Sequence, residues 1–190
     1  KSFAPSQGEP WTLGYNKGVK VVSKTISTAT IDEIAMEFRA SSGGSGDKRH
    51  RAREAALQLM YQWEIGRMAE MDLSEAADSF WGVHPAPVRR RVFATELAKG
   101  TAAHLSTIDP LIEAHADNWR LSRMAVIDRI IMRLAIYELI HTDTPPPVVI
   151  DEALELAKTF SGDQAVGFIN GVLDSVRRHL ESDDGEARSL

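Results

Sequence analysis

The sequence predicts an all-α protein in which two packed helical subdomains form a helical bundle, with a short N-terminal hairpin and helix appended to it. Three observations support this fold class. From residue 51 onward, apolar side chains recur every three or four positions, the spacing of one face of a helix. Capping residues and prolines fall at the ends of these stretches. A Gly/Ser run at residues 41–46 divides this part from a segment of different character.

The appended segment, residues 1–40, gives mixed signals. Asn16-Lys17-Gly18 is a turn candidate ahead of the β-branched run Val19–Ile26, which predicts a hairpin. A capping box that begins at Thr30 opens a short amphipathic helix as far as Phe38. So small a core is not expected to fold alone, and the segment is typical of a partner-derived peptide.

We interpret residues 41–46 as a flexible, engineered linker that holds this peptide close to its target. We therefore expect residues 1–40 to dock on residues 47–182, which form the main helical domain. A natural N-terminal extension is the alternative. Residues 183–190 are polar and are expected to form a disordered tail.

The helices of the main domain follow from periodicity, caps and prolines. Asp72 lies at the expected start of the second helix, and Thr107 and Ser122 are expected to cap the fourth and fifth. Gly100, inside the third helix, costs about 1 kcal/mol relative to Ala, which indicates close packing there. The expected helices span 51–65, 73–80, from 85 or 87 to 105, 110–119, a long stretch after 122 that ends before 144, 149–160 and 165–180.

Several kinds of chemistry are excluded or disfavoured. The sequence has no cysteine, which excludes disulfides, thiolate metal sites and cysteine nucleophiles. None of the six histidines pairs with another at a metal-ligand spacing, and no phosphate-binding glycine motif is present. We therefore expect no catalytic residue, metal or cofactor, and no enzyme. No apolar run reaches the roughly 20 residues needed to span a bilayer, so we expect a cytoplasmic protein.

One charged cluster has a clear mechanism. Lys48, Arg49, Arg51 and Arg53 place four cations in six positions at a helix opening, although the formal net charge of the chain is −5. Such cations contact phosphates without reading sequence. A solvated helix start is the alternative, and Arg53 could instead pair with a carboxylate. Arg89-Arg90-Arg91 is a second basic run, for which a solvated face is the simpler interpretation.

Recognition of unpaired RNA requires flat side chains for stacking and amides for base edges. Tyr61, Phe168 and Gln164 are the candidates for these contacts. Tyr61 and Trp63 cannot both face inward, because they lie two positions apart on a helix. Phe160 is expected in the core.

Four segments together resemble the NusB family. Residues 49–63 (RHRAREAALQLMYQW) are similar to its opening helix. The stretch NWRLSRM at 118–124, followed by IDR and RLAIYEL as far as residue 139, is similar to its central signature. Residues 149–160 and 168–174 complete the match, which covers nearly all of residues 48–180 in order. The small Gly167 just before Phe168 departs from the family pattern.

The resemblance implies a transcription antitermination factor that binds the boxA element of nascent rRNA leader RNA. It also implies a partner, the ribosomal small-subunit protein NusE, which links the factor to the transcription complex. The family's arginine-rich start corresponds here to the basic cluster, and its RNA-facing aromatics to Tyr61 and Phe168. Asp128 and Arg129 correspond to the NusE-facing region, with a buried ion pair between helices as the alternative.

Two other functions stay open at this point. The chain could be a protein-interaction module whose main partner is the parent of residues 1–40. It could also be a NusB-like domain cut from an rRNA cytosine methyltransferase, which transfer of a methyl group from S-adenosylmethionine would reveal.

Overall fold

The computed structural model describes residues 48–66, 72–117 and 119–187, with side chains as far as residue 182. Seven α-helices and one 3₁₀ turn occupy these residues, among which there is no strand, and the all-α prediction is confirmed. None of the described helices is both long enough and apolar enough to cross a membrane. The hairpin, short helix and linker predicted for residues 1–46 lie outside the described residues.

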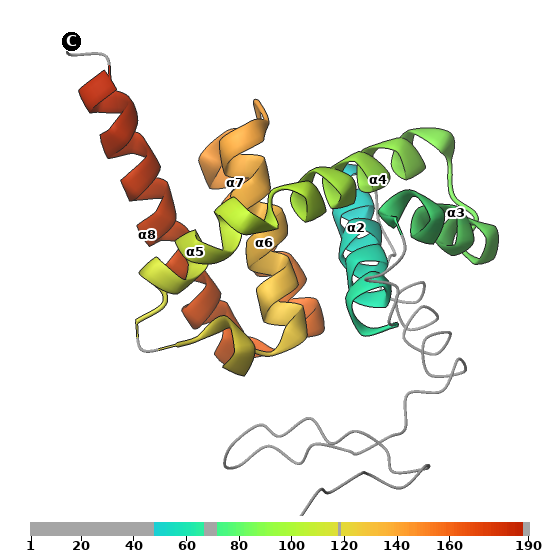
Figure 1. The fold of residues 1–190 in the computed structure, drawn as a ribbon, viewed down its shortest axis with the longest axis horizontal. Helices are drawn as coiled ribbons and strands as arrows, with labels where there is room; N and C mark the ends of the chain where they lie inside the picture. The colour runs from blue at the N-terminus through green and yellow to red at the C-terminus, as the bar shows by residue number, and fades with distance from the viewer. Residues whose placement is uncertain (1–47, 67–71, 118, 188–190) are drawn as a thin grey trace, which may run out of the picture. The chain divides into compact units, whose positions relative to one another are not determined.

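The helices form two groups that share α6 (Figure 1). The first group packs α2 against α4, with α3 beside them, and the second packs α5, α7 and α8 around α6. The α6 helix also contacts α2 and α4, so it joins the two groups. In chain order the elements are α2 (Lys48–Ile65), α3 (Leu73–Val83), α4 (Val88–Ala103), α5 (Leu105–His115), η2 (Leu121–Arg123), α6 (Val126–His141), α7 (Pro146–Phe160) and α8 (Asp163–Ala187).

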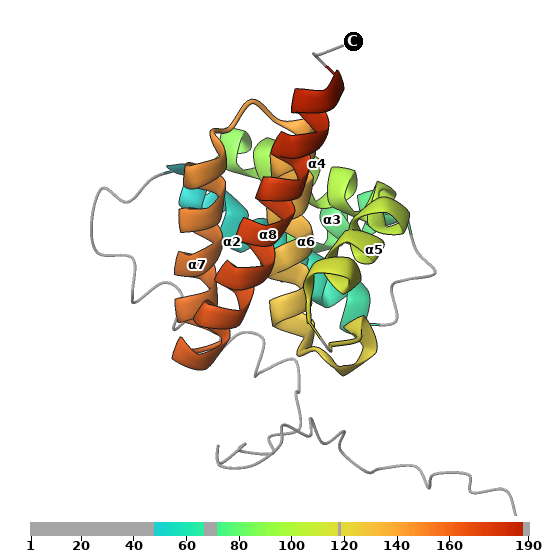
Figure 2. The same ribbon diagram turned by 90° about the vertical axis from the view of Figure 1, so that its left-hand side faces the viewer.

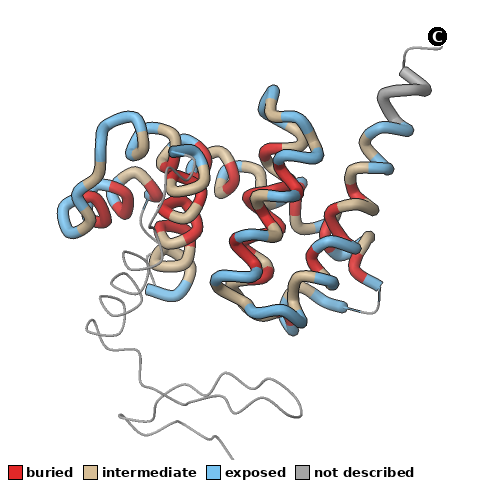
Figure 3. Tube along the Cα trace, turned by 180° about the vertical axis from the view of Figure 1, so that it is seen from behind, coloured by how far each residue is buried: buried red, intermediate tan, exposed pale blue. Residues whose placement is uncertain are grey.

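A single hydrophobic cluster runs through both groups, on the sides of the helices that face one another (Figure 3). Its largest fully buried members are the aliphatic side chains Leu59, Met60, Ile108, Ile112, Ile130, Ile131, Met132, Ile136, Val149, Ile169, Leu173 and Val176. Residues 130–136 of α6 are all buried, so this helix has no solvent-facing side over two turns.

Gly100 lies where α4 meets α6, and the predicted close packing is confirmed. A Cβ at this position would overlap the ring of Tyr137, whose Cε2 would lie 2.7 Å away. The glycine therefore allows a closer approach of the two helices than any other residue would.

The starts of α5 and α6 differ from the predictions. Only His104 separates α4 from α5, so Thr107 lies inside the first turn rather than capping it. The helix ends at His115, four residues earlier than expected. Ser122 does not cap α6 either, because it lies in the η2 turn, and α6 begins after Ala125.

The last two helices are longer than predicted. The α7 helix begins at Pro146, where a proline in the first turn needs no hydrogen-bond partner for its nitrogen. Gly162 then turns the chain with φ of 87°, a value that favours glycine. The α8 helix continues to Ala187, past residue 183, where a disordered tail was expected. No proline interrupts it there.

Candidate nucleic-acid interface

The start of α2 presents cations to solvent. Lys48 and Arg49 are exposed and Arg51 is half-buried, all within the first turn or just after it. The helix carries no acidic residue in this turn. Positive charge at a helix N-terminus is unfavourable for the helix itself, so an anionic partner would be stabilising here.

Arg53 differs from the other three cations because it is buried. Its Nε and Nη2 donate to the two carboxylate oxygens of Glu138 on α6, both at 2.8 Å, and its Nη1 lies 3.5 Å from Glu152 on α7. Its guanidinium also lies over the Phe93 ring, 5.7 Å from the centroid. This placement favours the structural use of Arg53 over an RNA contact.

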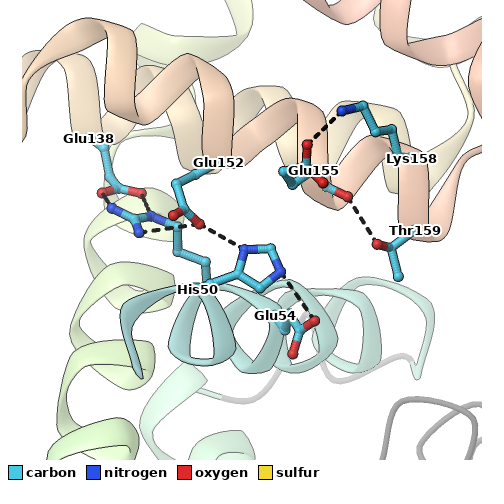
Figure 4. Close-up of polar contacts among 8 residues, drawn as sticks. His50, Glu54, Glu138, Glu152, Glu155, Lys158 and Thr159 are labelled. Carbon is cyan, nitrogen blue, oxygen red and sulfur yellow. Dashed lines mark hydrogen bonds and ion pairs between the residues drawn. The ribbon is translucent and has the colours of Figure 1, made fainter. Parts of the chain in front are cut away.

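His50 forms a second link from α2 to α7. Its Nδ1 lies 2.8 Å from a carboxylate oxygen of Glu152, and its Nε2 lies 3.4 Å from Glu54 on its own helix (Figure 4). The hydrogen bond with Glu54, reinforced by Glu152 and opposed by burial, raises the pKa of His50 to about 9. The imidazole is therefore protonated at neutral pH, and α2 is held to α7 by a charged pair.

Tyr61 lies well away from the basic cluster. It lies ten positions after Arg51, which is about 15 Å along a helix. The ring packs half-buried against the core, as does that of Trp63, and burial raises the pKa of the Tyr61 phenol. From their spacing we expected that Tyr61 and Trp63 would not both face inward. In the structure both are half-buried, and neither is fully buried or fully exposed.

The candidates on α8 lie together, on another part of the domain. Gln164 is exposed and lies one helical turn before Phe168, which is half-buried. The Phe168 ring contacts that of Trp119, with centroids 5.7 Å apart and planes inclined by 51°. The α8 helix packs beside α7, the helix to which His50 and Arg53 hold the start of α2 (Figure 2).

Trp119 is the site residue that the sequence analysis missed. Its side chain is 44% exposed, and it lies in the short segment between α5 and η2. The sequence placed it at the end of the helix expected over 110–119, and the available signal was the pair of arginines that follow it, Arg120 and Arg123.

Asp128 and Arg129 are both largely buried, with 9% of Asp128 and 14% of the Arg129 side chain exposed. Arg129 pairs with Glu64 at the end of α2 and donates to the Leu121 carbonyl at 2.9 Å. Burial raises the pKa of the Asp128 carboxyl, and the Ser161 hydroxyl opposes that shift. The alternative left open for this pair was a buried ion pair between helices. Arg129 does form such an ion pair, but with Glu64 of α2 and not with Asp128.

Arg133 extends this network. Its Nη1 lies 2.9 Å from Glu64, while its Nε and Nη2 donate to Asp109 of α5 at 2.7 and 2.8 Å. Three helices, α2, α5 and α6, are thus joined by alternating charges. No sequence pattern identified these partners, because they lie 24 to 69 positions apart.

Comparison with known proteins gives a consistent result. The model of the NusB family matches residues 50–178. The chain is 44% identical over 132 residues to a transcription antitermination protein NusB of Solibacter usitatus, covering 70% of this chain and 90% of the relative. It is 47% identical over 135 residues to the protein of the same name from an Anaeromyxobacter species, covering 70% and 92%.

Solved structures show the same fold. The structure of T. maritima NusB superposes with a TM-score of 0.62 at 34% identity, covering 68% of this chain and 90% of that one. A structure of antitermination factors NusB and NusE in complex with double-stranded RNA superposes with a TM-score of 0.60, covering 70% and 97%. At 23% identity, that second likeness concerns the fold alone.

Proposed function

The chain belongs to the NusB family, and from this we propose that it is a transcription antitermination factor that binds single-stranded boxA-type RNA of nascent rRNA leader transcripts together with NusE. The observation that carries the proposal is the match over residues 50–178, shared with relatives of 44% and 47% identity that are named as antitermination proteins. The whole helical domain, not a single motif, supports it.

The start of α2 is suited to phosphate contacts. Arg53 and His50 fix the helix to α6 and α7, while Lys48 and Arg49 extend into solvent from its first turn. Cations on a helix that is already fixed lose little conformational freedom when they bind, which favours affinity. They position the RNA backbone, while base recognition is left to flatter side chains.

NusE is the protein partner in this proposal. Asp128 and Arg129 stay proposed on the NusE-facing side of the domain. Arg129 also holds the end of α2 and the η2 turn in place.

The test is RNA affinity as a function of salt. The double variant Lys48→Ala/Arg49→Ala removes two outward cations and should weaken binding of boxA RNA. The slope of log K against log salt should become shallower by about 1.4, since each single-strand phosphate contact contributes about 0.7. Lys99→Ala, which removes an exposed cation from α4, is the matched control and should change neither quantity.

Unchanged affinity and an unchanged slope in the double variant would contradict a role for the α2 start. Equal affinity of the unmodified protein for boxA RNA and for a scrambled RNA of the same length would contradict the proposed function as a whole.

A further inference from the structure

We propose that Trp119 and Phe168 form a stacking site for one unpaired base of the RNA, with Arg120 and Arg123 contacting the adjoining phosphates. This inference deepens the proposed function and rests on it. The site lies on the segment between α5 and α6 and on the first turns of α8, apart from the basic start of α2.

The exposure of Trp119 requires an explanation. Its side chain is 44% exposed, whereas Trp81, whose Nε1 donates to Thr95 at 2.8 Å, is 7% exposed. An indole is a large apolar group, and leaving nearly half of it in water forgoes favourable burial. Aromatic side chains left exposed beside a second ring are typical of surfaces that receive a flat ligand.

The segment that carries Trp119 is held from both sides. The Glu113 carboxylate of α5 accepts the Leu121 N–H at 3.1 Å, and Arg129 of α6 donates to the Leu121 carbonyl at 2.9 Å. Arg129 is itself fixed by its ion pair with Glu64. The indole is therefore presented on a constrained turn, which reduces the entropy lost when a base stacks on it.

The charges beside the ring suit a nucleotide. Arg120 and Arg123 are exposed, and neither guanidinium has an ion-pair partner within residues 48–66, 72–117 and 119–182. The segment's own acid, Asp117, is also exposed, while Glu113 of α5 is engaged with the Leu121 N–H. The two exposed arginines that follow Trp119 outnumber this acid, which favours a phosphate-linked base over an apolar protein side chain, since such a ligand brings both a π face and negative charge.

The start of α8 brings polar and exposed positions beside the Phe168 ring. Phe168 is half-buried, and Gly167 before it is exposed. Gln164, one turn earlier on α8, is exposed and offers an amide for a base edge.

The experiment compares two substitutions of Trp119 in the full chain. Trp119→Leu keeps an apolar side chain over Phe168 but removes the stacking face, and Trp119→Phe keeps the face. Measured by fluorescence anisotropy with labelled boxA RNA, Trp119→Leu should weaken binding roughly tenfold, within the range known for loss of one base–aromatic stack. Trp119→Phe should stay within about threefold of the unmodified protein.

A second measurement identifies the base. Single abasic nucleotides are placed at each position of the RNA in turn. For the unmodified protein, removing the base at the stacked position should weaken RNA binding about tenfold. For Trp119→Leu, the same abasic RNA and the intact RNA should bind with equal affinity. Thermal unfolding followed by circular dichroism checks that both variants keep the fold.

Four results would overturn the inference. Equal losses for Trp119→Leu and Trp119→Phe would indicate a packing effect, and the absence of any coupled abasic position would exclude stacking. A Trp119→Leu variant with weaker NusE binding and unchanged RNA binding would make this surface a protein contact. Unchanged RNA affinity in Trp119→Leu, alongside a loss in Lys48→Ala/Arg49→Ala, would reject the stacking site while the proposed function stands.

Discussion

Both ends of α2 are fastened to neighbouring helices by ion pairs, but with the charges reversed. At its start, Arg53 of α2 pairs with Glu138 of α6. At its end, Glu64 of α2 pairs with Arg129 and Arg133 of α6. The pair at the start is almost fully buried, with side chains 4% and 3% exposed, whereas Glu64 is 20% exposed and shares its charge between two cations.

Both arrangements oppose the helix dipole. A helix favours acids at its N-terminus and bases at its C-terminus, and α2 has no acid in its first turn and no base in its last. Its position is therefore set by its neighbours and not by its own electrostatics. The difference between the ends is that the start also carries the exposed cations Lys48 and Arg49, while Glu64 at the end pairs with Arg129 and Arg133.

The largest effect is expected at the buried pair. Arg53→Met should lower the free energy of unfolding by about 3–5 kcal/mol, because it leaves the Glu138 carboxylate buried without its partner. Chemical denaturation measures this. The double variant Arg53→Met/Glu138→Leu should recover most of the loss, since replacing a whole buried pair by apolar groups is often neutral. If the free energy of unfolding of Arg53→Met lay within about 1 kcal/mol of that of the unmodified protein, this account would be contradicted.

A smaller effect is expected at the other end of α2. Glu64→Gln should cost about 1–2 kcal/mol, because Arg133 keeps Asp109 and Arg129 keeps the Leu121 carbonyl. The same denaturation series compares the two ends directly. A loss as large as that of Arg53→Met would show that the end of α2, and not its start, is the principal attachment.

The His50 link makes the start of α2 sensitive to pH. Because the pKa of His50 is raised to about 9, its stabilisation is fully present below pH 6.5 and is lost as the pH rises through 9. We expect a loss of about 1 kcal/mol across this range, limited by solvent screening of a pair whose side chains are 27% and 17% exposed. His50→Gln should remove this part of the pH dependence. An identical slope in both proteins would mean that His50 does not link α2 to α7 through its charge.

The smallest effect concerns Asp128, in the first turn of α6. Burial raises the pKa of this carboxyl, so the folded protein holds the proton more tightly than the unfolded chain and stability falls as the pH rises through the raised pKa. Asp128→Asn should therefore gain about 0.5 kcal/mol at neutral pH, a gain reduced by the favourable position of an acid in the first turn of α6. The gain should vanish below about pH 4. If Asp128→Asn were less stable than the unmodified protein at pH 7, the Asp128 carboxylate would be stabilised by its surroundings, and this prediction would be wrong.

The sequence predicted the helices because apolar periodicity reflects burial, and the close approach at Gly100 because a glycine inside a helix needs a reason. It did not predict where some helices start. Ser122 has the chemistry of a cap, but contacts to Leu121 from Glu113 and Arg129 hold that segment as a 3₁₀ turn. Contacts between residues that are far apart in the chain therefore determine where α6 begins.

In the candidate site, too, some features could be predicted from the sequence and others depend on contacts between distant residues. A cluster of cations at a helix opening is visible in sequence, yet which of them faces inward depends on carboxylates 85 and 99 positions away, Glu138 and Glu152. Trp119 was overlooked because the sequence placed it at the end of a helix expected over 110–119, whereas that helix ends at His115 and leaves the indole on the segment that follows. Its meeting with Phe168 is a property of how α5 and α8 pack.

The burial of α6 on every side has a consequence for how the domain unfolds. A helix that packs against both groups cannot lose one of them and keep its apolar surface covered. We expect a single cooperative transition, with equal calorimetric and van't Hoff enthalpies, and the slowest amide exchange in the middle of α6. Neither half should therefore persist as an independent folding unit, and a break in the chain between α4 and α5 should yield two fragments that acquire structure only when mixed.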